Sequence, residues 1–128
     1  MGTPPSDVRT RYRLLVVDDD PVTHRLVRTW FQGQPYDVLG AADGREGLQK
    51  ARSEHPDLVL MDVKMPGIGG IAAADQLRRS HPDVVVMLLS VTPEHALPAD
   101  LMTCGARFCH KERFGPEVLD SLWRDRMP

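Results

Sequence analysis

Apolar runs of strand length alternate with amphipathic segments of helical length along this chain, and that alternation restricts the folds open to it. Strands are predicted at residues 13–17, 36–41, 57–61, 84–89 and 106–110. The third run is apolar without alternation, which is typical of a central strand buried on both faces, and the fourth is the longest apolar run and the richest in β-branched residues. Strands joined by helical segments pair in parallel through right-handed crossovers. We therefore expect an α/β fold in which a five-stranded parallel sheet lies between two layers of helices as a three-layer sandwich.

The first helix has a clear start signal. Asp20 is suited to cap a helix whose first residue is Pro21. This helix is expected to end near Gly33. Its apolar stripe is expected to consist of Val22, Leu26, Trp30, Val27 and Phe31.

The remaining helices are predicted from similar signals. Asp43 and Glu46 make a capping-box-like start for a helix that ends near residue 54. Another helix is expected at 71–80. Pro98 would interrupt the next one, so only a short helix at 99–103 is expected. The apolar face of the last helix is expected to carry Phe114, Val118, Leu119, Leu122 and Trp123.

The size and composition of the chain fit one globular domain. Its 128 residues, 41% apolar content and formal net charge of −2 allow a buried core and give no electrostatic reason for direct binding to nucleic acid. No apolar run approaches the ~20 residues that a membrane span needs. Residues 1–12 are interpreted as a flexible lead-in and residues 13–126 as a single domain with no output domain. Cys104 and Cys109 lack metal-site spacing, so we expect reduced thiols and a cytoplasmic location.

Polar side chains stand at the ends of four predicted strands. The acidic run 18–20 follows the first strand, Asp62 the third, Ser90 the fourth and Lys111 the fifth. Carboxylates about 4 Å apart repel by roughly 4 kcal/mol at an effective dielectric of about 20, so the acidic run favours a hard divalent cation. Ligands of parallel sheets bind at the carboxyl ends of the strands, and for a strand order of 2-1-3-4-5 Asp62 would face Asp18 and Asp19. Acids, a hydroxyl and an ammonium around one pocket are suited to handling a phosphoryl group with Mg²⁺.

These residues lie in four motifs that resemble those of the receiver domain of two-component response regulators. Residues 17–21 resemble the family's acidic motif, and residues 60–67 its phosphoacceptor motif. Residues 88–90 match the hydroxyl motif, and residues 105–111 the aromatic-plus-lysine motif. The resemblance covers about residues 13–123. It implies a flavodoxin-like, doubly wound (βα)5 fold and a role in phosphorelay signal transduction.

The resemblance also implies a phosphoacceptor and a metal site. Asp62 would accept a phosphoryl group from a phosphohistidine of a histidine kinase or a histidine phosphotransfer protein. Asp19 would bind Mg²⁺ directly and Asp18 through water, with Asp62 and the backbone carbonyl of Lys64 as further ligands. The domain would then be a signalling phosphoprotein and not an enzyme, capable at most of self-phosphorylation from small phosphodonors and of self-dephosphorylation.

Three further residues are implied to bind the phosphoryl group or to respond to it. Lys111 would pair with Asp62 before transfer and with a phosphoryl oxygen afterwards. Ser90 would donate a hydrogen bond to another phosphoryl oxygen and draw its loop inward. Phe108 would turn inward with that movement, which shifts the surface of the fourth helix, fifth strand and last helix between two packings. Static packing of Phe108 at the sheet edge is the alternative.

The chain departs from the family pattern at a few positions. Val91 follows Ser90 where a smaller residue is usual, and we expect Val91 and Lys64 together to slow loss of the phosphoryl group by covering it. A mobile surface lysine and a packing valine are the plainer interpretation. Gly69 stands where an aspartate often caps the third helix. The proline-interrupted fourth helix argues against standard dimerisation through that surface and leaves open a weak homodimer.

Two other functions remain open at this point. Asp18 and Asp20 satisfy the Asp-x-Asp pattern of haloacid-dehalogenase-type phosphatases, although those enzymes generally need a longer chain and a cap. A receiver-like module could instead bind partners without any phosphate. The downstream partner is either a separate protein target or a lost output domain.

Overall fold

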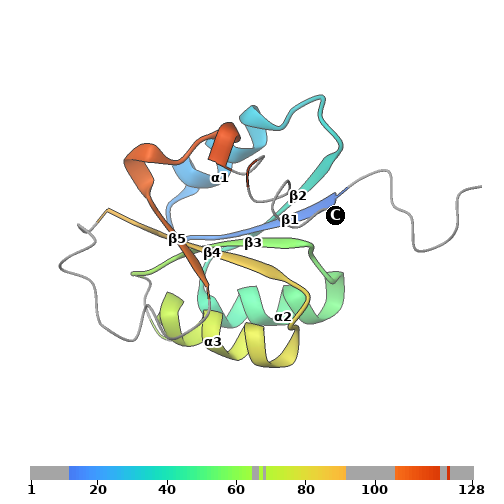
Figure 1. Cartoon of the computed structure of the whole chain (residues 1–128), viewed down its shortest axis with the longest axis vertical. Coiled ribbons are helices and arrows are strands. Elements are labelled where there is room, and N and C mark those ends of the chain that lie inside the picture. The colour runs from blue at the N-terminus through green and yellow to red at the C-terminus, as the bar shows by residue number, and fades with distance from the viewer. Residues whose placement is uncertain (1–11, 65–66, 68, 92–105, 119–120, 122–128) are drawn as a thin grey trace, which may run out of the picture.

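The structure is a computed structural model that describes residues 12–64, 67, 69–91, 106–118 and 121. These residues form a five-stranded sheet in the order β2-β1-β3-β4-β5, and every neighbouring pair of strands is parallel (Figure 1). The strands are β1 (Tyr12–Val17), β2 (Tyr36–Ala41), β3 (Leu58–Asp62), β4 (Val85–Ser90) and β5 (Arg107–His110). The helices are α1 (Pro21–Trp30), α2 (Gly44–Glu54) and α3 (Gly70–Ser80), with a short 3-10 turn, η3 (Lys111–Arg113), after β5. The predicted sheet, its strand order and its parallel direction are confirmed.

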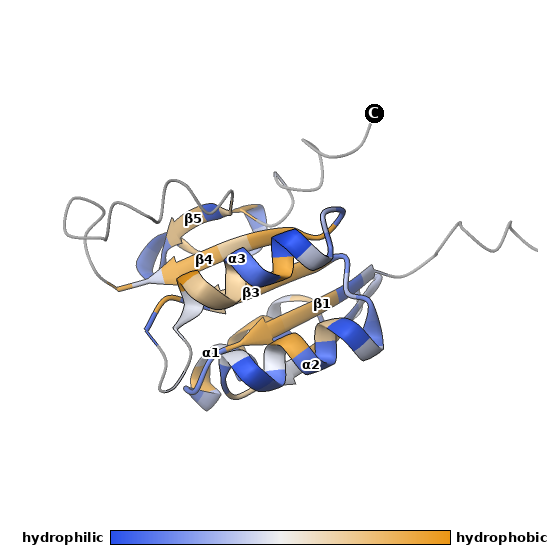
Figure 2. Cartoon of the chain, turned by 90° about the horizontal axis from the view of Figure 1, so that it is seen from below, coloured by the Kyte–Doolittle hydropathy of each residue, from blue (hydrophilic) through white to orange (hydrophobic). Residues whose placement is uncertain are grey.

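Helices cover both faces of the sheet. The helices α2 and α3 lie on one face and α1 lies on the other, together with the segment that follows β5 (Figure 1). Successive residues of a strand point to opposite faces, so β1 contributes to two separate cores. Leu15 and Val17 are buried in the cluster under α2 and α3, whereas Leu14 and Val16 are buried in the cluster under α1. Figure 2 shows the result, with apolar strands inside and mostly polar outer surfaces on the helices.

The predicted starts of α1 and α2 are confirmed. The Asp20 side chain caps α1 by accepting a hydrogen bond from the backbone N–H of Val22 at 2.9 Å. Asp43 caps α2 by accepting from the N–H of Glu46, whose own carboxylate accepts from the N–H of Ala42. Each cap satisfies a donor that the first turn of a helix would otherwise leave unpaired. The N-cap residue of α3 is Gly69, which provides no side-chain hydrogen bond to the helix, as the sequence indicated.

The predicted apolar stripe of α1 is partly wrong. Val27 and Phe31 are buried against the sheet, but Val22 is 49% exposed and Leu26 is 45% exposed. The buried pair and the exposed pair belong to adjacent i, i+4 rows of the same helix. Only one of these rows can face the sheet, and the sequence periodicity fits either. The helix also ends at Trp30, a few residues before the predicted end near Gly33.

The region after β5 is only partly described. Phe114 and Val118 pack against the cluster under α1, and the Phe114 ring lies 5.3 Å from the Trp30 ring, centroid to centroid. The other apolar residues predicted for the last helix, Leu119, Leu122 and Trp123, and the helix predicted at 99–103 lie outside the described residues. Among the residues that the structure describes, no helix is both long enough and apolar enough to cross a membrane.

Candidate functional site

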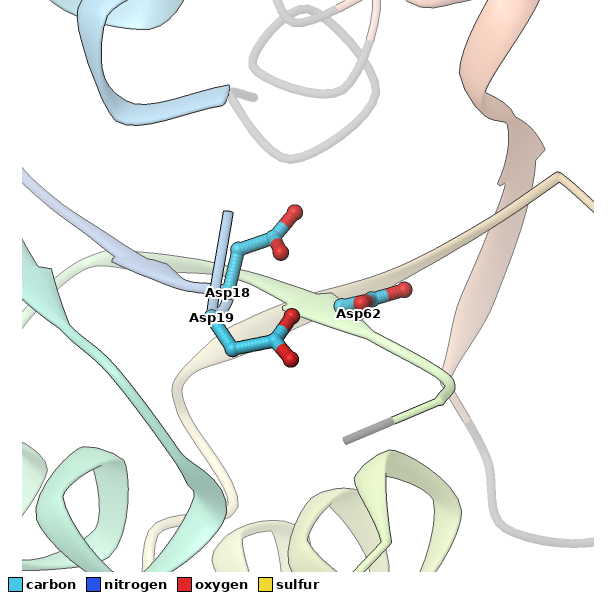
Figure 3. Close-up of side chains that lie close together, drawn as sticks. All are labelled: Asp18, Asp19 and Asp62. Atoms are coloured by element: carbon cyan, nitrogen blue, oxygen red, sulfur yellow. The ribbon is translucent and has the colours of Figure 1, made fainter. Parts of the chain in front are cut away.

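Three carboxylates meet at the carboxyl edge of the sheet, as the sequence predicted. Asp18 and Asp19 follow β1, and Asp62 is the last residue of the neighbouring strand β3. One carboxylate oxygen from each residue lies within 4.8 Å of the others, and Figure 3 shows the side chains converging. Asp18 and Asp62 are buried and Asp19 is exposed, so the cluster opens to solvent on the Asp19 side. Hard carboxylate oxygens with access to water are the ligands that Mg²⁺ prefers, so this donor set fits that ion.

Lys111 reaches this cluster from the end of β5. Its Nζ lies 2.8 Å from Asp18 Oδ2 and 3.7 Å from Asp62 Oδ1. Lys111 was predicted to pair with Asp62, and its ammonium lies within ion-pair distance of that carboxylate, but its hydrogen bond goes to Asp18. The lysine therefore bridges two of the three acids.

The charge state of Asp18 is set by opposing effects. Burial alone would raise the pKa of this carboxyl, since Asp18 is only 1% exposed. Hydrogen bonds from Lys111, from the backbone N–H of Asp20 and from Thr23 outweigh that effect, and the pKa of Asp18 is lowered. The pKa of Lys111 is raised, because its contact with Asp18 outweighs its own burial. Both groups are thus ionised at neutral pH and form a buried ion pair.

The pKa of Asp62 shifts in the opposite direction from that of Asp18. Its pKa rises from the ordinary 3.8 to about 6, first because the carboxyl is buried and then because the charge of Asp18 lies close to it. Lys111 and the backbone N–H of Lys64 favour the charged form but do not compensate. One ammonium lies beside two of the three acids, so the cluster keeps an excess of negative charge. A cation bound here would remove that excess.

The other predicted residues surround the cluster at different depths. Ser90, at the end of β4, is 1% exposed, and Phe108 is half-buried against the cluster under α2 and α3. The two residues predicted to cover the site both lie at the surface, with Lys64 exposed and Val91 64% exposed. The structure therefore brings Ser90 to the buried carboxyl edge of the sheet, whereas the Val91 and Lys64 side chains face mainly solvent.

A glycine that sequence reasoning missed, Gly70, shapes the site. A Cβ added to Gly70 would lie 2.0 Å from the backbone oxygen of Asp62, far inside van der Waals contact. The N–H of Gly70 donates to the carbonyl of Val63 at 3.1 Å, so the start of α3 lies directly against the end of β3. Glycine at this position allows that approach and so fixes where Asp62 lies. The adjacent pair Gly69 and Gly70 was the available signal.

Two histidines were also missed. His24 on α1 contacts the carbonyl of Asp18 through Nε2 at 2.7 Å, and its ring occupies the space above Gly40. His110 contacts the carbonyl of Val91 through Nε2 at 2.9 Å. Nothing in the spacing of the histidines along the sequence indicated contacts with the main chain around the site.

Comparison with known proteins settles the family. The family described as the response regulator receiver domain matches residues 14–122. The chain belongs to this family. The match covers most of the chain and favours the receiver interpretation over the phosphatase one.

Relatives and solved structures agree with that assignment. The receiver is 50% identical to the response regulator GacA of Pseudomonas viridiflava over 100 residues, which cover 73% of this chain and 45% of GacA. It is 38% identical to the response regulator UvrY of Escherichia coli K12 over 99 residues, covering 73% of this chain and 44% of UvrY. The chain thus matches less than half the length of these curated relatives.

Two solved structures share the fold closely. The chemotaxis protein CheY4 of Vibrio cholerae aligns with a TM-score of 0.77 and 29% identity, covering 89% of this chain and 98% of CheY4. The response regulator TrrA of Thermotoga maritima, in complex with Mg²⁺ and beryllium fluoride, aligns with a TM-score of 0.77 and 29% identity, covering 88% of this chain and 97% of TrrA.

Proposed function

We propose that this receiver accepts a phosphoryl group on Asp62 from a phosphohistidine of a histidine kinase or a histidine phosphotransfer protein. One observation carries the proposal: Asp62 is a buried carboxylate that ends β3, next to Asp18 and Asp19 and 3.7 Å from the Lys111 ammonium. In the transfer, an Asp62 oxygen attacks phosphorus and the P–N bond of the phosphohistidine breaks. The imidazole leaves with the bonding electrons and takes up a proton, and Asp62 becomes an acyl phosphate.

The acidic cluster would hold Mg²⁺, with Asp18, Asp19 and Asp62 as side-chain ligands and the backbone carbonyl of Lys64 as a further one. When bound, the ion would neutralise the charge that the phosphoryl oxygens bring next to these carboxylates. The raised pKa of Asp62 supports this assignment, because burial and the nearby charge of Asp18 disfavour its ionised form, which a bound cation would favour. TrrA, which is in complex with Mg²⁺ and beryllium fluoride, has the same fold.

Lys111 and Ser90 would bind the transferred group. Lys111 already lies between Asp18 and Asp62, so its ammonium needs only a small movement to reach a phosphoryl oxygen on Asp62. Ser90 ends the strand next to β3 and would donate its hydroxyl proton to another phosphoryl oxygen. Phe108, half-buried beside these groups on β5, would report the change to the surface that partners contact.

The proposal places the domain in the cytoplasm as a signalling protein, with at most self-phosphorylation from small donors as a reaction of its own. The curated relatives extend well beyond the matched segment. The downstream target of the signal is either a separate protein or an attached output domain.

Intact-mass measurement after incubation with Mg²⁺ and acetyl phosphate or phosphoramidate tests the proposal. We expect a gain of one phosphoryl group that is lost in Asp62→Asn. The matched control is Asp20→Asn, which lies beside the cluster, keeps a side-chain oxygen for the helix cap and should be phosphorylated like the wild type. If neither small donor works, a phosphorylated histidine phosphotransfer protein replaces them. No mass gain with any of these donors, or an unchanged gain in Asp62→Asn, would contradict the proposal.

A further inference from the structure

The His110 ring joins two backbone segments at the carboxyl edge of the sheet. Its Nε2 lies 2.9 Å from the carbonyl oxygen of Val91. Its Nδ1 accepts a hydrogen bond from the backbone N–H of Glu112 at 3.2 Å and so caps the turn η3. An amide N–H can only donate and a carbonyl can only accept, so both contacts are satisfied by one neutral tautomer, with the proton on Nε2.

These two segments carry the groups that would bind the phosphoryl group. Ser90 and His110 are register partners in the parallel pair of β4 and β5. Val91 directly follows Ser90, and Lys111 directly follows His110. The imidazole therefore connects the backbone just beyond the hydroxyl to the turn that begins with the ammonium, at the point where the strand pairing ends.

Packing gives the first residue beyond β4 little support. The Val91 side chain is 64% exposed, so its contacts with the core cannot fix the backbone there. The hydrogen bond from His110 to the Val91 carbonyl supplies a restraint that the side chain does not. Groups that bind a transferred phosphoryl group contribute most when they are held in place before the reaction.

We propose that His110 is a positioning residue for phosphoryl transfer, which holds Ser90 and Lys111 at a fixed spacing through the Val91 carbonyl and the η3 turn. The inference rests on the proposed function of Asp62. It assigns to His110 no contact with the phosphoryl group itself. The proposed role of His110 depends on the hydrogen bond from Nε2 to the Val91 carbonyl. The cap that Nδ1 provides to the η3 turn is not sufficient for it.

Two substitutions separate the two contacts of the ring. In His110→Gln, the side-chain amide nitrogen can take the place of Nε2 and donate to the Val91 carbonyl. In His110→Asn, the shorter side chain can take the place of Nδ1 and cap η3, but it cannot reach Val91. The matched control is His81→Gln, a histidine that follows α3 at the opposite edge of the sheet.

The test measures the rate of phosphorylation by phosphoramidate with saturating Mg²⁺, by intact mass. We expect His110→Asn to slow the reaction by about fivefold, the factor of about one neutral hydrogen bond. His110→Gln and His81→Gln should stay within about twofold of the wild type. Equal rates for the Gln and Asn variants of His110, whether both are slow or both normal, would overturn the inference.

A spectroscopic measurement tests the bridge without phosphorylation. Long-range ¹H–¹⁵N spectra of the protein labelled on histidine should show His110 as the neutral tautomer protonated on Nε2. The Nδ1-protonated tautomer, or a charged ring at pH 7.5, would overturn the bridge. Failure of the proposed function has a different signature, because the wild type itself would then gain no mass from any donor.

Discussion

Replacing Asp62 with asparagine removes one negative charge from the buried acidic cluster, and this change should stabilise the folded protein when Mg²⁺ is absent. The pKa of Asp62 is raised from 3.8 to about 6 by burial and by the charge of Asp18. Each unit of pKa difference between folded and unfolded protein corresponds to about 1.4 kcal/mol. Ionised Asp62 therefore lowers the free energy of unfolding by about 3 kcal/mol at pH 7.5, and Asp62→Asn should recover an amount of that order.

The destabilisation by Asp62 should increase as the pH rises. A raised pKa means that the folded protein binds the proton more tightly than the unfolded chain does, so the destabilisation is absent below pH 3.8 and complete above about pH 6. The advantage of Asp62→Asn should fall from about 3 kcal/mol at pH 7.5 to about half of that at pH 5. Urea unfolding in the presence of a chelator, monitored by circular dichroism at pH 7.5 and at pH 5, measures the difference in free energy of unfolding between the wild type and Asp62→Asn.

With Mg²⁺ present, the wild type should become more stable than Asp62→Asn. An ion that binds the folded wild type through Asp62 stabilises it by mass action, and the variant lacks one of the ligands. The control is Asp83→Asn, an exposed carboxylate in the turn before β4, which should change neither stability nor its response to Mg²⁺. The reasoning is refuted if Asp62→Asn leaves the free energy of unfolding unchanged or lowered at pH 7.5 without Mg²⁺.

Two further predictions concern the surroundings of Asp62. Gly70→Ala should lower the free energy of unfolding by about 2 kcal/mol or more and weaken Mg²⁺ binding, because its Cβ would meet the Asp62 carbonyl at 2.0 Å. Gly69→Ala, whose Cβ has no neighbour nearer than 3.9 Å, should cost less than about 1 kcal/mol, and equal losses in urea unfolding would contradict this account. Lys64→Ala and Val91→Ala should each shorten the lifetime of the phosphorylated protein about two- to threefold if these side chains shield the group from water, on the scale of a weak contact. Intact-mass time courses measure that lifetime, and unchanged values would favour the plain surface interpretation of both residues.

Local signals explain why so much of the fold could be predicted from the sequence. The two capping aspartates, Asp20 and Asp43, act within three residues of themselves, so their roles do not depend on the rest of the protein. The unbroken apolar runs of β3 and β4 similarly indicate burial on both faces. The buried face of α1 could not be predicted this way. Leu26 and Val27 are adjacent apolar residues, and only contact with the sheet determines which of them is covered.

The site was predictable to the level of which residues meet. Parallel strands end at a common edge, so strand order alone brings Asp62 beside the acidic run. The hydrogen bond from Lys111 to Asp18 could not be predicted in this way, since the long lysine side chain can reach either Asp18 or Asp62 and only the local geometry decides which of them accepts. The His110 bridge ends on a backbone carbonyl, whose position leaves no residue pattern in the sequence. The close approach at Gly70 was indicated only by the adjacent pair Gly69 and Gly70.

The ion pair between Lys111 and Asp18 explains why the acidic run divides into separate roles. Asp18 forms an ion pair with Lys111 and stays ionised, whereas burial and the charge of Asp18 disfavour the ionised form of Asp62. Asp19 is exposed and can offer an oxygen to an ion without first losing a protein partner among the described residues. Under the proposed function, a divalent cation and the lysine together would balance the three carboxylates of the cluster, and Asp62 would then be both ionised and available as a nucleophile at neutral pH. The same burial and nearby charge that disfavour the ionised form of Asp62 in the free protein would thus make the proposed phosphoryl transfer depend on a cation.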